Sequence, residues 1–407
     1  MTNLLELVAL FALARLLGEV FSRAKMPSLA VEIIAGVILG PILIGFVKPS
    51  DPLALVANLG IFFVVYEAGM EMTFRGVRKI IKESGAAVAA GSFILPFILG
   101  FQVALQFEFE LRAALFIGLA LSLTALPVSV RILADLNWVN TDVGQTIITA
   151  GLICDISGFV MLAAIINWNP AATGSNVGVI LEIALKVVLF FMVLLTSERI
   201  LSLKEEAISK RLVAGSQKLL SKGASFSVPL LAVFGFSLLA EFLGLHFVLG
   251  TFFGTVIVAE HLFPKKEEEQ LRHSISVISQ GFLAPIFFAY LGVVAVTFDI
   301  ALFPFFLALL VAGVVGKVAG SFAGARVAGF SPWSASVVAL GMNGRGAMEL
   351  VISLIGLELG IISSGTFSIL VLLGIVTTLM TPFALKWLAK RSRKNPLFIP
   401  KVPSNFE

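Results

Sequence analysis

Apolar segments of about twenty residues recur from one end of this 407-residue chain to the other. Because an α-helix rises about 1.5 Å per residue, a segment of that length spans the hydrocarbon core of a bilayer. A helix satisfies its backbone hydrogen bonds internally, which the bilayer interior requires of any spanning element. The segments therefore predict an all-α polytopic membrane protein.

Composition supports this class and excludes several functions. Hydrophobic residues make up 58% of the chain and charged residues only 13%, about half the charged share of a typical soluble protein. The single cysteine, Cys154, excludes an internal disulfide and a cysteine metal cluster. No nucleophile elbow, phosphate loop, zinc motif or haem motif is present. We therefore expect neither an enzyme nor a bound cofactor, and no nucleic-acid partner.

We predict about thirteen transmembrane helices within a membrane domain that covers residues 1–390, followed by a short cytoplasmic tail, residues 391–407. The spans lie at about 3–22, 29–47, 52–71, 84–106, 111–135, 142–167, 177–200, 225–243, 246–261, 274–297, 301–329, 333–358 and 365–389. The first span lacks a basic lead and a cleavage site, so we interpret it as a helix and not as a signal peptide.

Basic residues predict how the chain crosses the membrane. Of 29 Lys and Arg residues, 23 fall in the loops after odd-numbered spans and in the C-terminal tail, and two fall in the loops after even-numbered spans. Loops rich in Lys and Arg stay in the cytoplasm. The N-terminus is therefore expected outside and the C-terminus in the cytoplasm, in a cell inner or plasma membrane.

One span carries an acid at its centre. The segment 144–164 reads GQTIITAGLICDISGFVMLAA, and Asp155 lies about 20 Å from one end of a helix expected from Asp142 to Asn167. A carboxylate at that depth costs several kcal/mol unless it faces protein or water. Asp155 is therefore a candidate binding residue; the alternative is a neutral acid that hydrogen-bonds a neighbouring helix.

Two spans are predicted to be broken. One contains SLTALPVSVR around Pro127, and the other contains GMNGRGAME with three clustered glycines. Proline removes a backbone donor and glycine loosens a helix. Interrupted helices at matching positions in two halves indicate the binding site of a transporter built from inverted repeats. The alternative is that each break is a packing kink.

Oxygen atoms near the first break suggest a cation site. Asp155 supplies a titratable oxygen, and Thr124 and Ser129 supply neutral ones, which a hard monovalent cation needs to replace its water. Glu67, on the third span, is a second candidate acid. The alternative interpretation of Glu67 is a solvated carboxylate near a helix end.

Three further charged residues are candidate supports for this site. Glu349 follows Arg345 by four residues, which predicts an ion pair on one helix face. Arg345 can also neutralise carbonyl groups at the second break. Lys317 lies midway along its span, where a structural ion pair and a proton-linked role remain equally open.

Motifs in this order resemble those of the monovalent cation:proton antiporters, in the second branch of the cation:proton antiporter superfamily. They are VEIIAGVILGP, YEAGME, LTALPVSVRIL with the following TDVG, APIFFAYLGV, GMNGRGAMELVI and VTTLMTP. The resemblance covers nearly the whole chain. It implies a homodimer in which a core, about residues 84–167 and 301–389, moves against a dimerisation domain.

The resemblance also implies roles for individual residues. The family's ion-binding aspartate corresponds to Asp155, its broken-helix threonine to Thr124 and its second-repeat basic residue to Lys317. Two departures stand out. Many members carry an acid or asparagine where this chain has Cys154, and the glutamate that often follows Arg-Gly in the twelfth span is Ala347 here.

From these observations we expect a secondary-active sodium/proton antiporter that works by alternating access at Asp155, with electroneutral exchange. Protons and a monovalent cation would compete for that carboxylate. A potassium/proton antiporter is the nearest alternative. A gated cation channel and an organic-anion symporter are alternatives from other classes.

Overall fold

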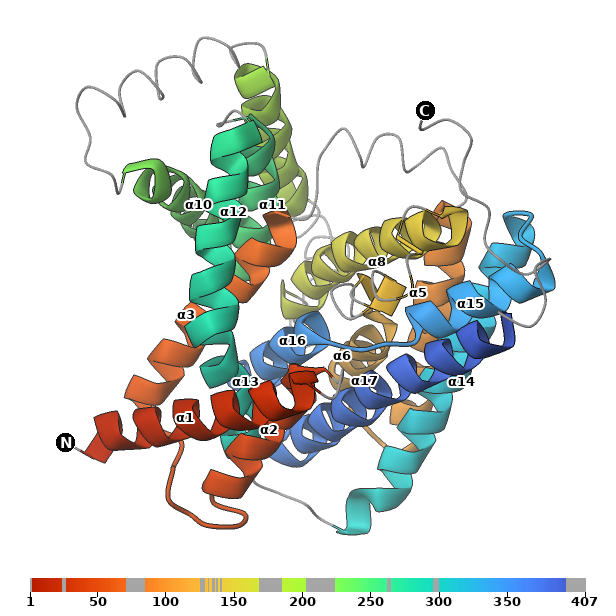
Figure 1. Cartoon of the computed structure of the whole chain (residues 1–407), viewed down its shortest axis with the longest axis horizontal. Helices are drawn as coiled ribbons and strands as arrows, with labels where there is room; N and C mark the ends of the chain where they lie inside the picture. Colours follow the sequence, from red (N-terminus) through yellow and green to blue (C-terminus); the bar gives the residue numbers. More distant parts are fainter. Residues whose placement is uncertain are drawn as a thin grey trace, which may run out of the picture. The chain divides into compact units, whose positions relative to one another are not determined.

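The computed structural model describes residues 2–23, 27–70, 85–124, 129–130, 132–133, 136, 138–139, 141–167, 185–202, 224–261, 265–295 and 300–392. Every regular element in these ranges is helical, so the predicted all-α class is confirmed (Figure 1). Six described helices are long and apolar enough to cross a bilayer, or seven if α15 and α16 are one bent span. Four shorter apolar helices accompany them, and the count of thirteen stays a prediction.

The chain divides into two compact units. The first unit comprises Met1–Leu55, Lys79–Gly158 and Pro285–Glu407, and the second comprises Val56–Arg78 and Phe159–Ala284. Three helices have residues in both units: α3 (Asp51–Met70), α8 (Asp142–Asn167) and the continuous helical segment α12–η1–α13.

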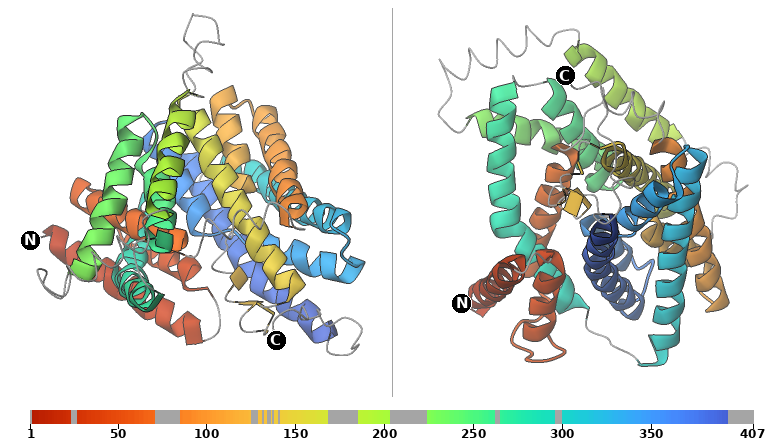
Figure 2. Two further views of the ribbon diagram at one scale, coloured as in Figure 1. Left: turned by 90° about the horizontal axis from the view of Figure 1, so that it is seen from above. Right: turned by 45° about the vertical axis from the view of Figure 1, so that its right-hand side comes forward.

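Helices α5 and α14 pack along each other in the first unit (Figure 2). Gly91 and Gly320 face each other there, and a Cβ added to either would collide with the other's backbone carbonyl. Small residues let helix backbones approach closely where no hydrophobic force drives helices together in lipid. The helices of this unit are α1 (Thr2–Arg23), α2 (Ser28–Leu39), α5 (Gly85–Gln106), α6 (Leu111–Ser122), most of α8, α13 (Ala284–Val294), α14 (Phe303–Val327), α15 (Pro332–Met342), α16 (Ala347–Glu358) and α17 (Ser364–Ser392).

A buried apolar cluster holds α5, α8, α14, α15 and α17 together. Its members include Val88 on α5, Ile147 and Cys154 on α8, Met342 on α15 and Leu385 on α17. Cys154 is fully buried in this cluster, one residue before the candidate acid. Packing in the interior of the first unit therefore fixes the position of Asp155.

The second unit is built from α10 (Ala224–Phe242), α11 (Phe247–His261), most of α3, α12 (Lys265–Ile278) and the helical residues 185–202. Tyr66 of α3 packs in its apolar cluster with Val233, Leu271 and Leu283. Gly250 on α11 lies so close to Phe236 on α10 that a Cβ there would collide with the Phe236 carbonyl. The α10–α11 hairpin is therefore tightly packed.

Two predicted spans differ from the structure at their ends. The span expected over 29–47 is helical only to Leu39, because Gly40 adopts an extended conformation before Pro41. The helix expected over 274–297 begins at Lys265 and passes through a π-helical turn, η1 (Ser279–Leu283), before Pro285. The missing backbone donor of a proline is a common reason for such irregularity.

Candidate functional site

The first predicted break begins where α6 ends at Ser122. Leu123 is extended, and Thr124 is buried and non-helical. Pro127, which motivated the predicted break, lies outside the described residues. The Thr124 hydroxyl lies within reach of the Cys154 thiol on α8, with which it interacts. The prediction of a helix interrupted in the middle of this span is supported as far as Thr124.

Lys317 reaches the end of this broken helix from α14. Its ammonium group, fully buried, donates a hydrogen bond to the carbonyl oxygen of Ser122. The last carbonyls of a helix have no partner within the helix and carry partial negative charge. Lys317 therefore caps the carboxyl end of α6.

Asp155 lies near Lys317. Its side chain is buried, and Coulomb attraction couples the Lys317 ammonium to the Asp155 carboxylate. The helix α8 approaches the break closely, because Gly158 packs against the side chain of Leu123. The structure thus brings Asp155, Thr124 and Lys317 together in one neighbourhood.

The Cys154 thiol precedes Asp155 on α8 and is fully buried. Its sulfur lies 3.8 Å from the Ala89 carbonyl oxygen and 3.8 Å from the Ser92 hydroxyl, both on α5. These are the distances of weak sulfur hydrogen bonds. The thiol is therefore held by α5, while the Lys317 ammonium donates to the Ser122 carbonyl.

The second predicted break lies between α15 and α16, whose axes are bent by 41° across it (Figure 1). Residues 343–346 are non-helical, as the glycine cluster predicted. Asn343 caps α15 and is buried, and Gly346, which precedes α16, is fully extended. The interrupted helix predicted for this span is confirmed.

A hydrogen bond joins the two breaks. The hydroxyl of Ser129, just beyond the first break, donates to the carbonyl oxygen of Gly341 near the end of α15, at 2.7 Å. Both residues are buried, and they are 212 residues apart in the chain. Ser129 therefore satisfies a carbonyl freed by the second break, in addition to its predicted role as a neutral oxygen ligand.

Arg345 and Glu349 form the predicted ion pair. Nη1 of Arg345 lies 3.1 Å from Oε1 of Glu349, and both side chains are fully buried. The guanidinium also lies over Gly313 of α14, where a Cβ would collide with it. Coulomb interactions extend from this pair to Lys317. The prediction that these two residues pair is confirmed.

Glu67 belongs to the second unit, where it has a local partner. Gln280, in the π-helical turn, donates from Nε2 to Oε2 of Glu67 at 2.8 Å, and Arg272 donates to the Met70 carbonyl at the end of α3. Glu67 is half-buried. Its role as a second ion- or proton-binding acid stays a prediction.

Sequence reasoning missed several contacts of this site. Three hydrogen bonds join residues that are distant in the chain: Lys317 to the Ser122 carbonyl, Ser129 to the Gly341 carbonyl and Thr378 to the Arg345 carbonyl. The threonine-rich VTTLMTP motif was the one local signal of the last contact. Among the described residues, no group of three or more His, Cys, Asp or Glu side chains converges on a metal-binding position.

Comparison with known proteins assigns the chain to a family. A family described as "Sodium/hydrogen exchanger, transmembrane" matches residues 7–391. The Na⁺/H⁺-K⁺ antiporter GerN of Bacillus cereus is 29% identical over 383 residues, covering 93% of this chain and 95% of the relative. An Na⁺/H⁺ antiporter of Enterococcus hirae is 27% identical over 394 residues, covering 96% and 99%.

A solved structure supports the fold. The sodium proton antiporter MjNhaP1 from Methanocaldococcus jannaschii matches with a TM-score of 0.69 at 14% identity, over 96% of this chain and 99% of that protein. At that identity the likeness establishes the fold alone. Together with the match over residues 7–391, it shows that the chain is a multi-pass membrane protein of the transmembrane sodium/hydrogen exchanger family.

Proposed function

We propose that this chain is a sodium/proton antiporter in which Asp155 carries either a proton or a sodium ion. The observation that carries the proposal is the position of Asp155: it is a buried carboxylate near Lys317, which caps the end of α6, and its helix packs against Leu123, the residue before Thr124. Discontinuous helices whose ends surround an acid are how transporters build a cation site in the membrane. The names of the curated relatives agree with this assignment.

The mechanism follows from competition at one carboxylate. A proton and a cation cannot occupy Asp155 together, so exposing it alternately to the two sides exchanges one for the other. The hydroxyls of Thr124 and Ser129 would provide neutral ligands, and Arg345, Glu349 and Lys317 would keep the helix ends in place. Transport of this kind needs no cofactor and no catalytic step.

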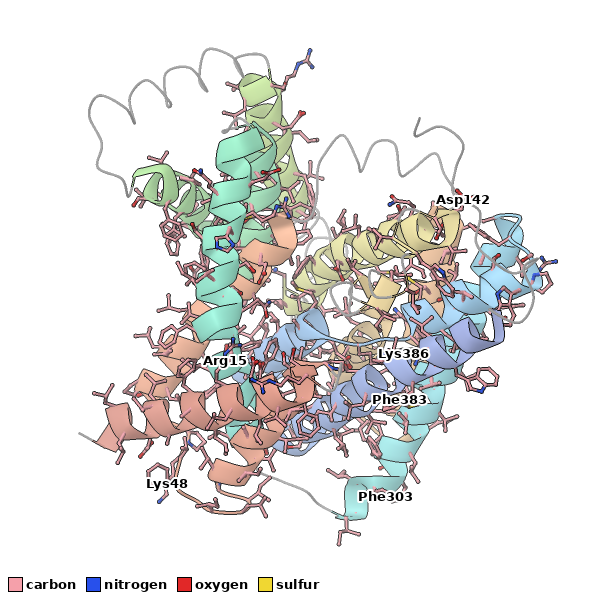
Figure 3. The ribbon with its side chains drawn as sticks, in the orientation of Figure 1. Arg15, Lys48, Asp142, Phe303, Phe383 and Lys386 are labelled. Carbon is pink, nitrogen blue, oxygen red and sulfur yellow. The ribbon has the colours of Figure 1, made fainter. Side chains whose placement is uncertain are left out.

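We further propose a homodimer in a cell inner or plasma membrane, with the N-terminus outside and the C-terminus in the cytoplasm. The distribution of Lys and Arg among the loops supports this orientation. In the first unit, Lys48 and Phe303 lie toward the lower edge of Figure 3 and Asp142 toward the upper edge. This separation agrees with an outer face near Lys48 and a cytoplasmic face near Asp142.

Potassium is a second candidate substrate because GerN is named an Na⁺/H⁺-K⁺ antiporter. The test is cation-driven proton movement in proteoliposomes that contain a pH-sensitive dye, with lithium, sodium and potassium compared. Sodium should move protons at lower concentration than potassium. A potassium response of equal strength would make the substrate range broader than proposed.

The same assay separates the proposal from its rivals. Apparent sodium affinity should rise with pH, because fewer protons compete for Asp155. A sodium flux with no proton counterflow would indicate a channel, and uptake of a labelled organic acid would indicate a symporter. An apparent affinity that stays flat from about pH 6 to 9, a range that brackets a perturbed carboxylate, would contradict competition at one site.

A further inference from the structure

The breaks in two helices leave backbone carbonyl groups that other elements must satisfy. In the bilayer interior, an unsatisfied backbone group costs several kcal/mol. The structure shows a side-chain donor for three of these carbonyls: Lys317 for Ser122, Ser129 for Gly341 and Thr378 for Arg345. The first two donors were already candidates for the ion site, whereas Thr378 was not.

Thr378 differs from its neighbours on α17. The hydroxyls of Thr377 and Thr381 donate to carbonyls of their own helix, one turn earlier, at Leu373 and Thr377. Thr378 donates instead across to the carbonyl of Arg345, in the non-helical link between α15 and α16. All three threonines are fully buried. Burial therefore does not explain why one of them bonds outside its own helix.

The carbonyl that Thr378 holds is next to the site's charged groups. It belongs to Arg345, whose guanidinium pairs with Glu349 and packs over Gly313. On the other side of the link, the Gly341 carbonyl accepts from Ser129. Hydrogen bonds therefore hold the chain on both sides of the link. A shift of the link would also move the Gly341 carbonyl, and with it the Ser129 hydroxyl that is proposed as a cation ligand.

We propose that Thr378 is a positioning residue for cation binding. Its hydroxyl fixes the link between α15 and α16. Because the Gly341 carbonyl accepts from Ser129, a fixed link also keeps the Ser129 hydroxyl in place. The proposal rests on the proposed antiport function. Thr378 itself does not touch the cation; losing its hydroxyl weakens cation binding because the link becomes free to shift.

The experiment compares Thr378→Val, which removes the hydroxyl and keeps the shape, with Thr378→Ser, which keeps the hydroxyl. Thr377→Val is the matched control, since it removes an equally buried hydroxyl that bonds within α17. In proteoliposomes, Thr378→Val should raise the apparent KM for sodium about tenfold, the effect of losing one buried hydrogen bond. Its maximal rate should change much less. Thr378→Ser and Thr377→Val should stay within about threefold of the wild-type KM, well below the loss of one buried hydrogen bond.

A second measurement does not depend on transport. Backbone hydrogen exchange in the peptide that covers residues 343–350 should be faster in Thr378→Val than in wild type or Thr377→Val. If exchange speeds up but the wild-type protein moves no protons with sodium, the proposed function fails while the hydrogen bond stands. If exchange does not change, or if Thr378→Ser raises KM as much as Thr378→Val, the positioning role is wrong.

A second pair of variants tests whether Thr378→Val simply fails to fold. If Thr378→Val is not monodisperse in size-exclusion chromatography, Thr378→Ala removes the hydroxyl without a branched side chain and is compared with Thr377→Ala. Failure of both Thr378 variants to fold, with both Thr377 variants folded, would mean that Thr378 supports the fold as a whole, and this would overturn the proposal.

Discussion

At the scale of single residues, Lys317 shows how a fully buried charge is stabilised. An unpaired ammonium group inside a protein pays a large desolvation cost. Lys317 offsets part of that cost by donating to the Ser122 carbonyl at the negative end of α6 and by Coulomb attraction to Asp155 and Glu349, against repulsion from the nearby Arg345. The lysine thereby stabilises the broken helix on which the site is built.

Replacing Asp155 by asparagine should abolish sodium-driven proton movement and leave the protein folded. The amide keeps the size of the side chain but cannot exchange a proton. Asp142→Asn is the matched control, because Asp142 is an exposed acid at the start of the same helix. The measurement is dye dequenching in proteoliposomes made from monodisperse protein. Exchange retained by Asp155→Asn would show that another group carries the proton.

At the scale of elements, two ion pairs with the same spacing occupy opposite environments. Arg345 and Glu349 are fully buried, whereas the side chains of Arg23 and Glu19, with nitrogen and oxygen 3.5 Å apart, are 80% and 53% exposed. Removing one partner of a buried pair leaves an uncompensated charge and costs about 3–5 kcal/mol. An exposed pair contributes at most about 1 kcal/mol.

We therefore expect Glu349→Gln to lower the thermal unfolding midpoint strongly, and Glu19→Gln to leave it nearly unchanged. Both substitutions remove one negative charge from an i, i+4 pair, so they differ chiefly in burial. The measurement is intrinsic fluorescence during heating in detergent. Equal midpoints for the two variants would mean that the Arg345 guanidinium is stabilised by something other than Glu349.

Much of this architecture could be predicted from local sequence. Hydropathy placed α8 from Asp142 to Asn167, and the glycines around Arg345 predicted the second break. The Arg345–Glu349 pair followed from spacing on one helix face. Contacts such as Ser129 with Gly341 could not be predicted, because local patterns carry no information about which distant carbonyl a hydroxyl will meet. The early end of α2 at Leu39 could have been predicted from Gly40-Pro41.

At the scale of the whole molecule, the first prediction concerns orientation. In a Cys154→Ser background, cysteines placed at Lys48 and Glu110 should react with a membrane-impermeant maleimide added outside intact cells, and a cysteine at Ser331 should not. All three positions are exposed in the structure. The reason is the concentration of Lys and Arg in the loops after odd-numbered spans. The opposite labelling pattern would reverse the proposed topology.

The charge carried by each transport cycle is the second prediction at this scale. We expect one cation to exchange for one proton, with no net charge moved. Position 154 carries a thiol and not a second acid, and Lys317 donates to the Ser122 carbonyl, so the proposed carrier, Asp155, has no neighbouring carboxylate at position 154. In the proposed cycle Asp155 takes a proton in one direction and a cation in the other, so the charge that moves is the same both ways.

The measurement is sodium/proton exchange in proteoliposomes whose membrane potential is clamped with an ionophore for an ion that the protein does not carry. Electroneutral exchange should reach the same final sodium distribution with and without an imposed potential of about 100 mV, which is worth about 2.3 kcal/mol for each net charge moved. A distribution that shifts with the potential would require a second proton. Repeating the measurement with Lys317→Gln and with Glu67→Gln would then identify the carrier, since the potential dependence should disappear only in the variant that removes it.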